Sequence, residues 1–434
     1  MKKRNPIALL PIGVFLGMYL GLGLVFEYGL GISMGFYKVP IIIAFLTAIL
    51  VACLQNKSLS FEDKLEVMGQ GVGDKNIITM LLIFLTAGAF VGVVGRSSAQ
   101  SVAYFMLDII PAQFAVVVLF LVACFVSTSM GTSVGTITLL TPIAAEVAQA
   151  SGFSLPLCVG TVVGGAMFGD NLSFISDTTI AACNGQGCAM QDKFKGNFFI
   201  ALPAAIGTVI LVLALTLGQT PTPITQGYDL VQIIPYVLVL AGGIAGINVF
   251  VVLLIGIASG AVIMLLTGQT DFISLLGSMG NGASGMFETS MVAVLVAALC
   301  ALIRVYGGFD ALLAFIQQLF KGKKGGQLGM GLLVGAMDIA TANNTVAIVM
   351  ANPIAKEMSR DYDISPQRAA CILDTFSCIF QGLIPYGAQM LVAVTAVSEM
   401  ELQINAFEIM QYLFYPYLLL LSCLAAIYLI PQKK

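Results

Sequence analysis

Long apolar segments separated by short polar ones run through almost the whole chain. No charged residue occurs between Asp108 and Glu146 or between Asp229 and Asp271. A helix needs about 20 apolar residues to cross a bilayer, so the second interval can hold two spans. Segments of about 9–11 alternating residues, which are typical of outer-membrane barrels, do not occur. The pattern predicts an all-α polytopic membrane protein with spans near residues 7–26, 36–54, 76–95, 112–128, 134–150, 154–182, 196–218, 231–247, 249–267, 287–306, 328–358, 367–397 and 408–430.

The composition agrees with this prediction and narrows the function. Of the 434 residues, 59% are hydrophobic and 9% are charged, whereas soluble proteins carry roughly 25% charged residues. The net charge of −3 is too small to indicate nucleic-acid binding. The chain has no His, which excludes a His-centred proton relay and an imidazole metal site. It also lacks a G-x-x-x-x-G-K-[ST] phosphate loop. We therefore expect no enzyme and no ATPase, and uphill transport would need an ion gradient.

Two separated motifs indicate an internal duplication. Residues 68–71 recur as 279–282, and residues 141–146 recur as 352–357, both at an offset of 211 residues. Each motif contains Gly or Pro, so the shared offset is harder to reach by chance than a match of apolar residues. We expect a first repeat over 1–220 and a second over 221–434.

The loop charges predict that the two repeats are inverted. Cytoplasmic loops collect Lys and Arg. Lysines precede the 76–95 span, and residues 97–111 after it contain no Lys or Arg. The order reverses in the second half, where residues 268–286 lack both and lysines follow the 287–306 span. Inverted repeats are typical of secondary transporters. The loop lysines in this comparison are Lys57, Lys64, Lys75, Lys321, Lys323 and Lys324. The basic ends of the chain, with Lys2, Lys3 and Arg4 at one end and Lys433 and Lys434 at the other, predict that both termini are cytoplasmic.

Polar segments break the apolar pattern at matched places in the two halves. Residues 127–136 correspond to 338–345, and residues 169–179 correspond to 380–387. Unpaired backbone is tolerated at membrane depth only when it is buried in protein or lines a cavity. Freed carbonyls and helix ends suit a small cation or an anionic group. Ser, Thr, Asn and Asp add the oxygen ligands that hard cations prefer. We expect sodium as the coupling ion and no other cofactor.

Carboxylates in or near these segments are the strongest single candidates, because a charged group inside the membrane is costly and functional by default. Asp170 and Asp177 are seven residues apart, so they share a face if the segment is helical. At the shared offset they align with Gln381 and Ala388, which makes the expected site lopsided. A lone Ser or Thr often bonds only to a neighbouring helix or its own backbone, but paired breaks favour a binding site. The candidates are Asp170, Asn171, Ser173, Asp177, Thr178, Asp338 and Asp374.

The string from Gly169 to Thr179 closely resembles the signature of the NhaC-type sodium/proton antiporter family, apart from Phe174, where many members carry Pro. The resemblance covers nearly the whole chain. It implies a scaffold domain and a transport domain with re-entrant hairpins, which shift like an elevator within a homodimer. It also implies two hairpin tips, formed by Thr132, Ser133 and Thr136 and by Asn343, Asn344 and Thr345, with sodium at a subset of Thr132, Ser133, Asp170, Asn171, Asn343 and Asn344.

These features predict a sodium-coupled secondary transporter of a bacterial inner membrane, in its simplest form a sodium/proton antiporter. The alternative is a sodium-coupled carrier or exchanger of a small organic acid or amino acid, which the amides of Asn343, Asn344, Gln381 and Gln389 and the hydroxyl of Tyr386 would suit. A channel also fits inverted repeats with broken helices. An intramembrane aspartyl protease does not, because the G-x-G-D string has Met at position 167.

Overall fold

The computed structural model describes residues 4–32, 38–173, 176–219 and 227–429, and these residues form helices and connecting segments only. Eight of the helices found there are long and apolar enough to cross a membrane, which confirms the all-α polytopic prediction. The repeat boundary expected at 220–221 and the unusual Phe174 lie outside the described residues.

The N-terminal segment contains η1 (Pro6–Leu9), α1 (Leu10–Leu16), η2 (Gly17–Gly21), α2 (Leu22–Leu24) and η3 (Val25–Gly29). The helices that follow are α3 (Ile41–Gln55), α4 (Phe61–Val72), α5 (Lys75–Ile109), α6 (Ala112–Met130), α7 (Ser133–Ser151), α8 (Leu155–Leu172), α9 (Asp177–Gln186), α10 (Met190–Thr216), α11 (Leu230–Ile244), α12 (Val249–Leu266), α13 (Phe272–Gly285), α14 (Phe287–Val305), α15 (Gly308–Leu319), α16 (Gly322–Thr341), α17 (Asn344–Asp361), α18 (Pro366–Leu383), α19 (Ala388–Ser398), α20 (Ala406–Met410) and α21 (Phe414–Leu429).

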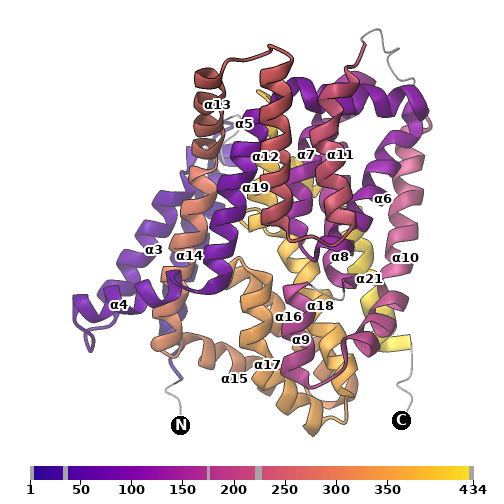
Figure 1. Ribbon diagram of the computed structural model, residues 1–434. Helices are drawn as coiled ribbons and strands as arrows, with labels where there is room; N and C mark the ends of the chain where they lie inside the picture. The colour runs from indigo at the N-terminus through magenta and orange to yellow at the C-terminus, as the bar shows by residue number, and fades with distance from the viewer. Residues whose placement is uncertain (1–3, 33–37, 174–175, 220–226, 430–434) are drawn as a thin grey trace.

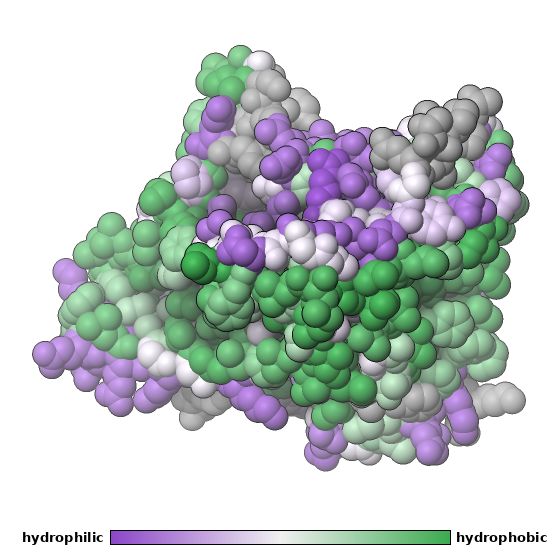
Figure 2. Space-filling model, turned by 45° about the horizontal axis from the view of Figure 1, so that its top comes forward, coloured by the Kyte–Doolittle hydropathy of each residue, from purple (hydrophilic) through white to green (hydrophobic). Residues whose placement is uncertain are grey.

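A broad apolar band crosses the face of the molecule seen in Figure 2, with hydrophilic residues gathered above and below it. Large apolar side chains such as Phe125, Phe199 and Leu421 are more than 60% exposed. Such exposure is unfavourable in water but expected against lipid, because acyl chains are as apolar as these side chains. The band therefore marks the part of the surface that faces the bilayer.

The helices themselves repeat at the offset found in the sequence. The pairs α4 and α13, α7 and α17, α8 and α18, and α9 and α19 each begin 211 residues apart. The cause is local in the first pair, because Ser60 and Asp271 occupy equivalent N-cap positions and accept backbone N–H groups of the first turn. Such caps fix where a helix starts.

Equivalent helices lie on opposite sides of the molecule. In Figure 1, α4 lies low at the left while its equivalent α13 lies at the top, and the hairpin of α6 and α7 lies above that of α16 and α17. The packing crosses between halves: α4 contacts α14 while α13 contacts α5, and α9 contacts α17 while α19 contacts α7. Both ends of the chain lie at the lower edge. The two halves are therefore inverted, as the loop charges predict.

Glycines allow very close packing where α13 contacts α5 and where α4 contacts α14. A Cβ on Gly282 of α13 would lie 2.1 Å from the carbonyl oxygen of Gly88 of α5, and a Cβ on Gly88 would lie 2.2 Å from that of Gly282. In the equivalent pair, a Cβ on Gly71 of α4 would lie 2.7 Å from the carbonyl oxygen of Ala297 of α14. Small residues let helix backbones approach this closely in membranes.

Gly282→Ala is expected to lower the thermal unfolding midpoint in detergent, because overpacking costs about 1–3 kcal/mol. Gly280→Ala is the matched control on the same helix, since nothing lies within 4 Å of its Cβ. In Gly280→Ala the higher helix propensity of Ala should stabilise the helix by roughly 1 kcal/mol, because no clash opposes it. Equal midpoints for the two variants would contradict the close packing of α13 on α5.

The structure agrees with the predicted breaks and extends one predicted span. Residues 154–182, 328–358 and 367–397 each form two helices, separated at the breaks expected in 169–179, 338–345 and 380–387, whereas α5 continues past the predicted span 76–95 to Ile109, with a non-helical Gly95 inside it. The chain also forms α4, α13 and α15, which were not predicted. Short helices with polar residues lack an apolar run long enough for a span, so a hydropathy pattern does not reveal them.

Candidate ion-binding site

Two helix breaks with nearly the same backbone form the tips of the hairpins. Gly131 ends α6 and Ala342 ends α16, both in the left-handed conformation, with φ of 69° and 46°. The next residue caps the following helix: Thr132 accepts the N–H of Gly135, and Asn343 accepts that of Val346. Glycine adopts positive φ without strain, whereas Ala does not. The placement of the six expected tip residues at these two breaks agrees with the sequence-based expectation.

The second break of the first half brings Asp170 to the same region. α8 ends at Leu172 and α9 begins at Asp177. Ser176 caps α9 by accepting the N–H of Thr179 at 3.2 Å, and its hydroxyl donates to the backbone oxygen of Asp170 at 3.0 Å. Asp170 and Asp177 therefore belong to different helices, so the condition under which they would share a helical face is not met. Asp170 is 4% exposed, whereas Asp177 is exposed at the start of α9.

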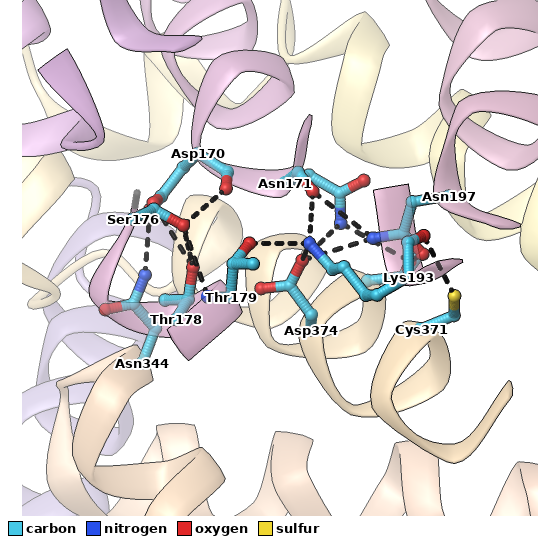
Figure 3. Close-up of polar contacts among 11 residues, drawn as sticks. Asp170, Asn171, Ser176, Thr178, Thr179, Lys193, Asn197, Asn344, Cys371 and Asp374 are labelled. Atoms are coloured by element: carbon cyan, nitrogen blue, oxygen red, sulfur yellow. Dashed lines mark hydrogen bonds and ion pairs between the residues drawn. The ribbon is translucent and has the colours of Figure 1, made fainter. Parts of the chain in front are cut away.

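The Asp170 carboxylate joins both tips and the second break. Its Oδ2 accepts hydrogen bonds from the Ser133 hydroxyl at 2.8 Å and from Nδ2 of Asn344 at 3.1 Å. Its Oδ1 accepts the hydroxyl of Thr178 at 3.3 Å. Ser133 and Asn344 are the first residues of α7 and α17, so two helix N-termini approach the carboxylate, an arrangement that stabilises a negative charge. Figure 3 shows the Asn344 side of this arrangement.

A cavity of about 70 Å³ borders this carboxylate. Both hairpin tips and the start of α9 form one side of it, and α5 closes the other side with Thr79, Met80 and Ile83. The predicted residues on its wall are Thr132, Ser133, Asp170, Asp177, Thr178, Asn343, Asn344 and Thr345. The wall is thus rich in hydroxyl, amide and carboxylate oxygens, a ligand set that suits a small hard cation.

A second polar cluster lies deeper in the bundle, around a lysine that the sequence did not single out. Lys193 of α10 is fully buried, and its Nζ lies 2.5 Å from Oδ2 of Asp374, 2.6 Å from the backbone oxygen of Asn171 and 2.7 Å from Oγ1 of Thr179. Asn197, one turn further along α10, donates to the same Asp374 oxygen at 3.2 Å. Figure 3 shows these side chains converging from different helices.

Five predicted residues do not line the cavity beside Asp170. Thr136 donates to the backbone oxygen of Thr132 and Ser173 to that of Thr128, so both hydroxyls bond to backbone. The other three lie deeper in the bundle. The Asn171 amide donates to Asp374 at 3.3 Å, and Asp338 accepts the Ser377 hydroxyl at 3.2 Å.

Lys193 and Asn197 belong to this second cluster but are not among the residues predicted from the sequence. Lys193 stands in a charged run with Asp192 and Lys195 just before the apolar 196–218 segment, a position typical of an interfacial helix end. The available signal is the spacing of four between Lys193 and Asn197, which puts them on one face of a helix. That face is buried, whereas Asp192 and Lys195 are exposed.

In the second half, Gln381 occupies the position equivalent to Asp170, and Ala388 occupies the position equivalent to Asp177. Gln381 donates to the backbone oxygen of Ala342 at 2.9 Å and to Oε1 of Gln389 at 2.8 Å. Gln389 in turn donates to the Ser133 hydroxyl at 3.1 Å. The Tyr386 hydroxyl donates to the backbone oxygen of Ile339. The carboxylate at the tips therefore comes from the first half alone, and the amides of the second half bind the protein itself.

Comparison with known families fits this arrangement of two similar halves. A family model described as the Na⁺/H⁺ antiporter family matches residues 4–218 and, a second time, residues 212–431. The chain belongs to this family. As a member of the Na⁺/H⁺ antiporter family with eight helices suited to crossing a bilayer among its described residues, it is a multi-pass membrane protein.

Named relatives cover the chain to different extents. The chain is 26% identical over 214 residues to the malate-2H⁺/Na⁺-lactate antiporter of Bacillus subtilis, covering 49% of this chain and 44% of that protein. It is 22% identical to the Na⁺/H⁺ antiporter NhaC of the same organism, covering 73% of this chain and 77% of that protein. Among solved structures, the YdaH transporter of Alcanivorax borkumensis has 16% identity and a TM-score of 0.45, over 85% of this chain and 89% of that chain. The chain thus spans less than half the length of some curated relatives that it matches.

Proposed function

We propose that the chain exchanges sodium for protons across the membrane at Asp170. The observation that carries this proposal is the position of the Asp170 carboxylate, which is buried, borders the cavity and accepts hydrogen bonds from both hairpin tips. One carboxylate can hold a proton or a sodium ion. Because the two cations compete for the same group, each excludes the other, and this exclusion couples their opposite fluxes.

The residues around Asp170 have separate parts in the exchange. Asp170 supplies the charge, and the hydroxyl oxygens of Ser133 and Thr178, 2.8 and 3.3 Å from the carboxylate, lie within reach of a cation bound there. Asn344 brings in the second hairpin. Since the two hairpins come from opposite repeats, loading the carboxylate changes contacts on both sides of the site at once. This is the requirement for a carrier that opens to one side and then to the other.

Membership of the family supports an antiporter, and one relative is named for sodium and protons alone. The alternative of an organic solute draws on the name of the malate and lactate relative. Of the four amides expected to suit such a solute, those of Gln381 and Gln389 are instead hydrogen-bonded to each other, to a backbone oxygen and to Ser133. This favours an ion over an organic cargo.

The proposal also includes the orientation of the protein in the membrane. The lysine-rich connections beside α4 and α15 lie on the side of the molecule that also carries both chain ends. By the preference of basic residues for the cytoplasmic side, that side faces the cytoplasm of a bacterial inner membrane. A homodimer, in which the hairpin-bearing helices shift against the scaffold, completes the proposal.

Proteoliposomes test the exchange directly. The purified protein is reconstituted with an acidic lumen and a trapped pH indicator, and sodium is added outside. We expect a sodium-dependent rise of internal pH that potassium does not produce. An unchanged pH together with sodium-dependent uptake of an organic acid would replace the proposal with the alternative.

Ser133→Ala is expected to raise the sodium concentration for half-maximal exchange by about tenfold. A hydrogen bond to a charged group contributes about 1.5–3 kcal/mol, and 1.4 kcal/mol corresponds to a factor of ten. Thr136→Val is the matched control on the first turns of α7, because the Thr136 hydroxyl bonds only to its own helix at Thr132. A shift as large in the control as in Ser133→Ala would argue against a specific contact at Ser133.

A further inference from the structure

We propose that the Lys193 ammonium is an internal cation that permanently fills a second cation position of the core. That position is formed by Asp374, the backbone oxygen of Asn171 and Thr179. As a consequence, the carrier keeps one exchangeable position, at Asp170. The inference rests on the proposed function for what Asp170 does.

The first argument is the coordination of the ammonium. An ammonium group has three donors, and the three oxygens around Nζ lie at 2.5, 2.6 and 2.7 Å. They are a carboxylate oxygen, a backbone carbonyl and a hydroxyl from α18, α8 and α9. The carbonyl of Asn171 is available because α8 ends one residue later, at Leu172. Carboxylate, carbonyl and hydroxyl oxygens at a helix end form the same kind of ligand set that a hard cation takes.

The second argument is that the cluster holds more oxygen than Lys193 uses. Oδ1 of Asp374 and Oδ1 of Asn171 are buried and accept no hydrogen bond of normal geometry among the described residues, although the Thr178 hydroxyl is close enough to interact with the Asp374 carboxylate. Buried polar atoms are nearly always hydrogen-bonded, so each exception needs an explanation. A pocket built to hold a cation explains two oxygens without donors, whereas a pocket built only to bury a lysine needs neither.

The third argument is the balance of charge. A buried ion without a partner is strongly destabilising. Asp374 has Lys193 as its partner, while Asp170 accepts hydrogen bonds from neutral donors only in the described chain. Asp338 does not border the cavity beside Asp170. The Lys193 ammonium beside Asp374 is covalently part of the chain and cannot leave. The carboxylate whose cation exchanges is therefore Asp170.

The test is equilibrium binding of radioactive sodium to the purified full-length protein. We expect one equivalent in the wild type and none in D170N. K193A should gain a second equivalent, because its truncated side chain leaves the oxygens free, and K193A/D374N should lose that equivalent again. No gain in K193A would overturn the inference. A wild type that binds no sodium would instead overturn the proposed function, so the two failures are distinguishable.

A measurement on the wild type keeps the inference testable even if K193A does not fold. With Lys193 charged throughout, one sodium exchanges for one proton, and no net charge moves. Sodium-driven proton movement in proteoliposomes should then be unchanged when valinomycin and a potassium gradient impose a membrane potential. Acceleration by the potential would mean that a second charge moves and would overturn the fixed role of Lys193.

Discussion

Asp170→Asn is expected to reduce sodium-driven proton exchange by at least about 100-fold. The variant keeps the size of the side chain but removes the charge of the carboxylate that accepts hydrogen bonds from both hairpin tips. Loss of a buried charged partner costs about 3–5 kcal/mol, and 1.4 kcal/mol corresponds to a factor of ten. The measurement is the initial rate of internal pH change in proteoliposomes at saturating sodium.

The control for this variant is Asp363→Asn, which removes the same charge from a side chain that is 92% exposed. Its exchange rate should match the wild type. Exchange by Asp170→Asn within a few-fold of the wild type would move the exchanging group elsewhere, with Asp338 the next candidate, since it is fully buried.

Asp374→Asn is expected to lose stability by about 3–5 kcal/mol, because it leaves the Lys193 ammonium buried without its carboxylate. The double variant Lys193→Met/Asp374→Asn removes both charges and should recover most of that loss. The reason is that replacing both members of a buried ion pair is often close to neutral. Thermal unfolding midpoints of the detergent-solubilised proteins measure the effect, and a double-mutant cycle isolates the coupling between the two residues.

The surface pair of Lys323 and Asp363 provides the matched comparison. It has the same chemistry at 3.1 Å, but its side chains are 40% and 92% exposed. An exposed pair contributes about 0–1 kcal/mol, so Asp363→Asn should leave the midpoint nearly unchanged. Similar midpoints for Asp374→Asn and Asp363→Asn would mean that the buried pair is not what holds α10 to α18.

The sequence predicted the parts of this structure that depend on local residues. The offset of 211 residues locates the start of four helix pairs, because caps and breaks are encoded where they occur, as at Ser60 and Asp271. The helix breaks at the two tips are predicted for the same reason, since Gly131 and the polar residues beside it interrupt an apolar run. The sequence marks Asp170 as a candidate because a carboxylate is conspicuous inside such a run.

What depends on packing between distant segments could not be predicted. The sequence places Asn171 beside Asp170, but one step along the end of α8 turns its amide toward Asp374 of α18. Lys193 is not among the predicted residues, because nothing local indicates that α10 begins beside the break between α8 and α9. Its buried position follows from contacts to oxygens on three other helices.

The crossed packing of the two halves has a consequence for biosynthesis. The first half leaves the ribosome before its partners exist, so α5 must wait for α13, and α7 for α19. Until then the glycine face of α5 at Gly88 has no helix against it, and the first hairpin has no counterpart. A first half made alone should therefore be degraded quickly. Two halves divided between α10 and α11 should protect each other only when one cell makes both.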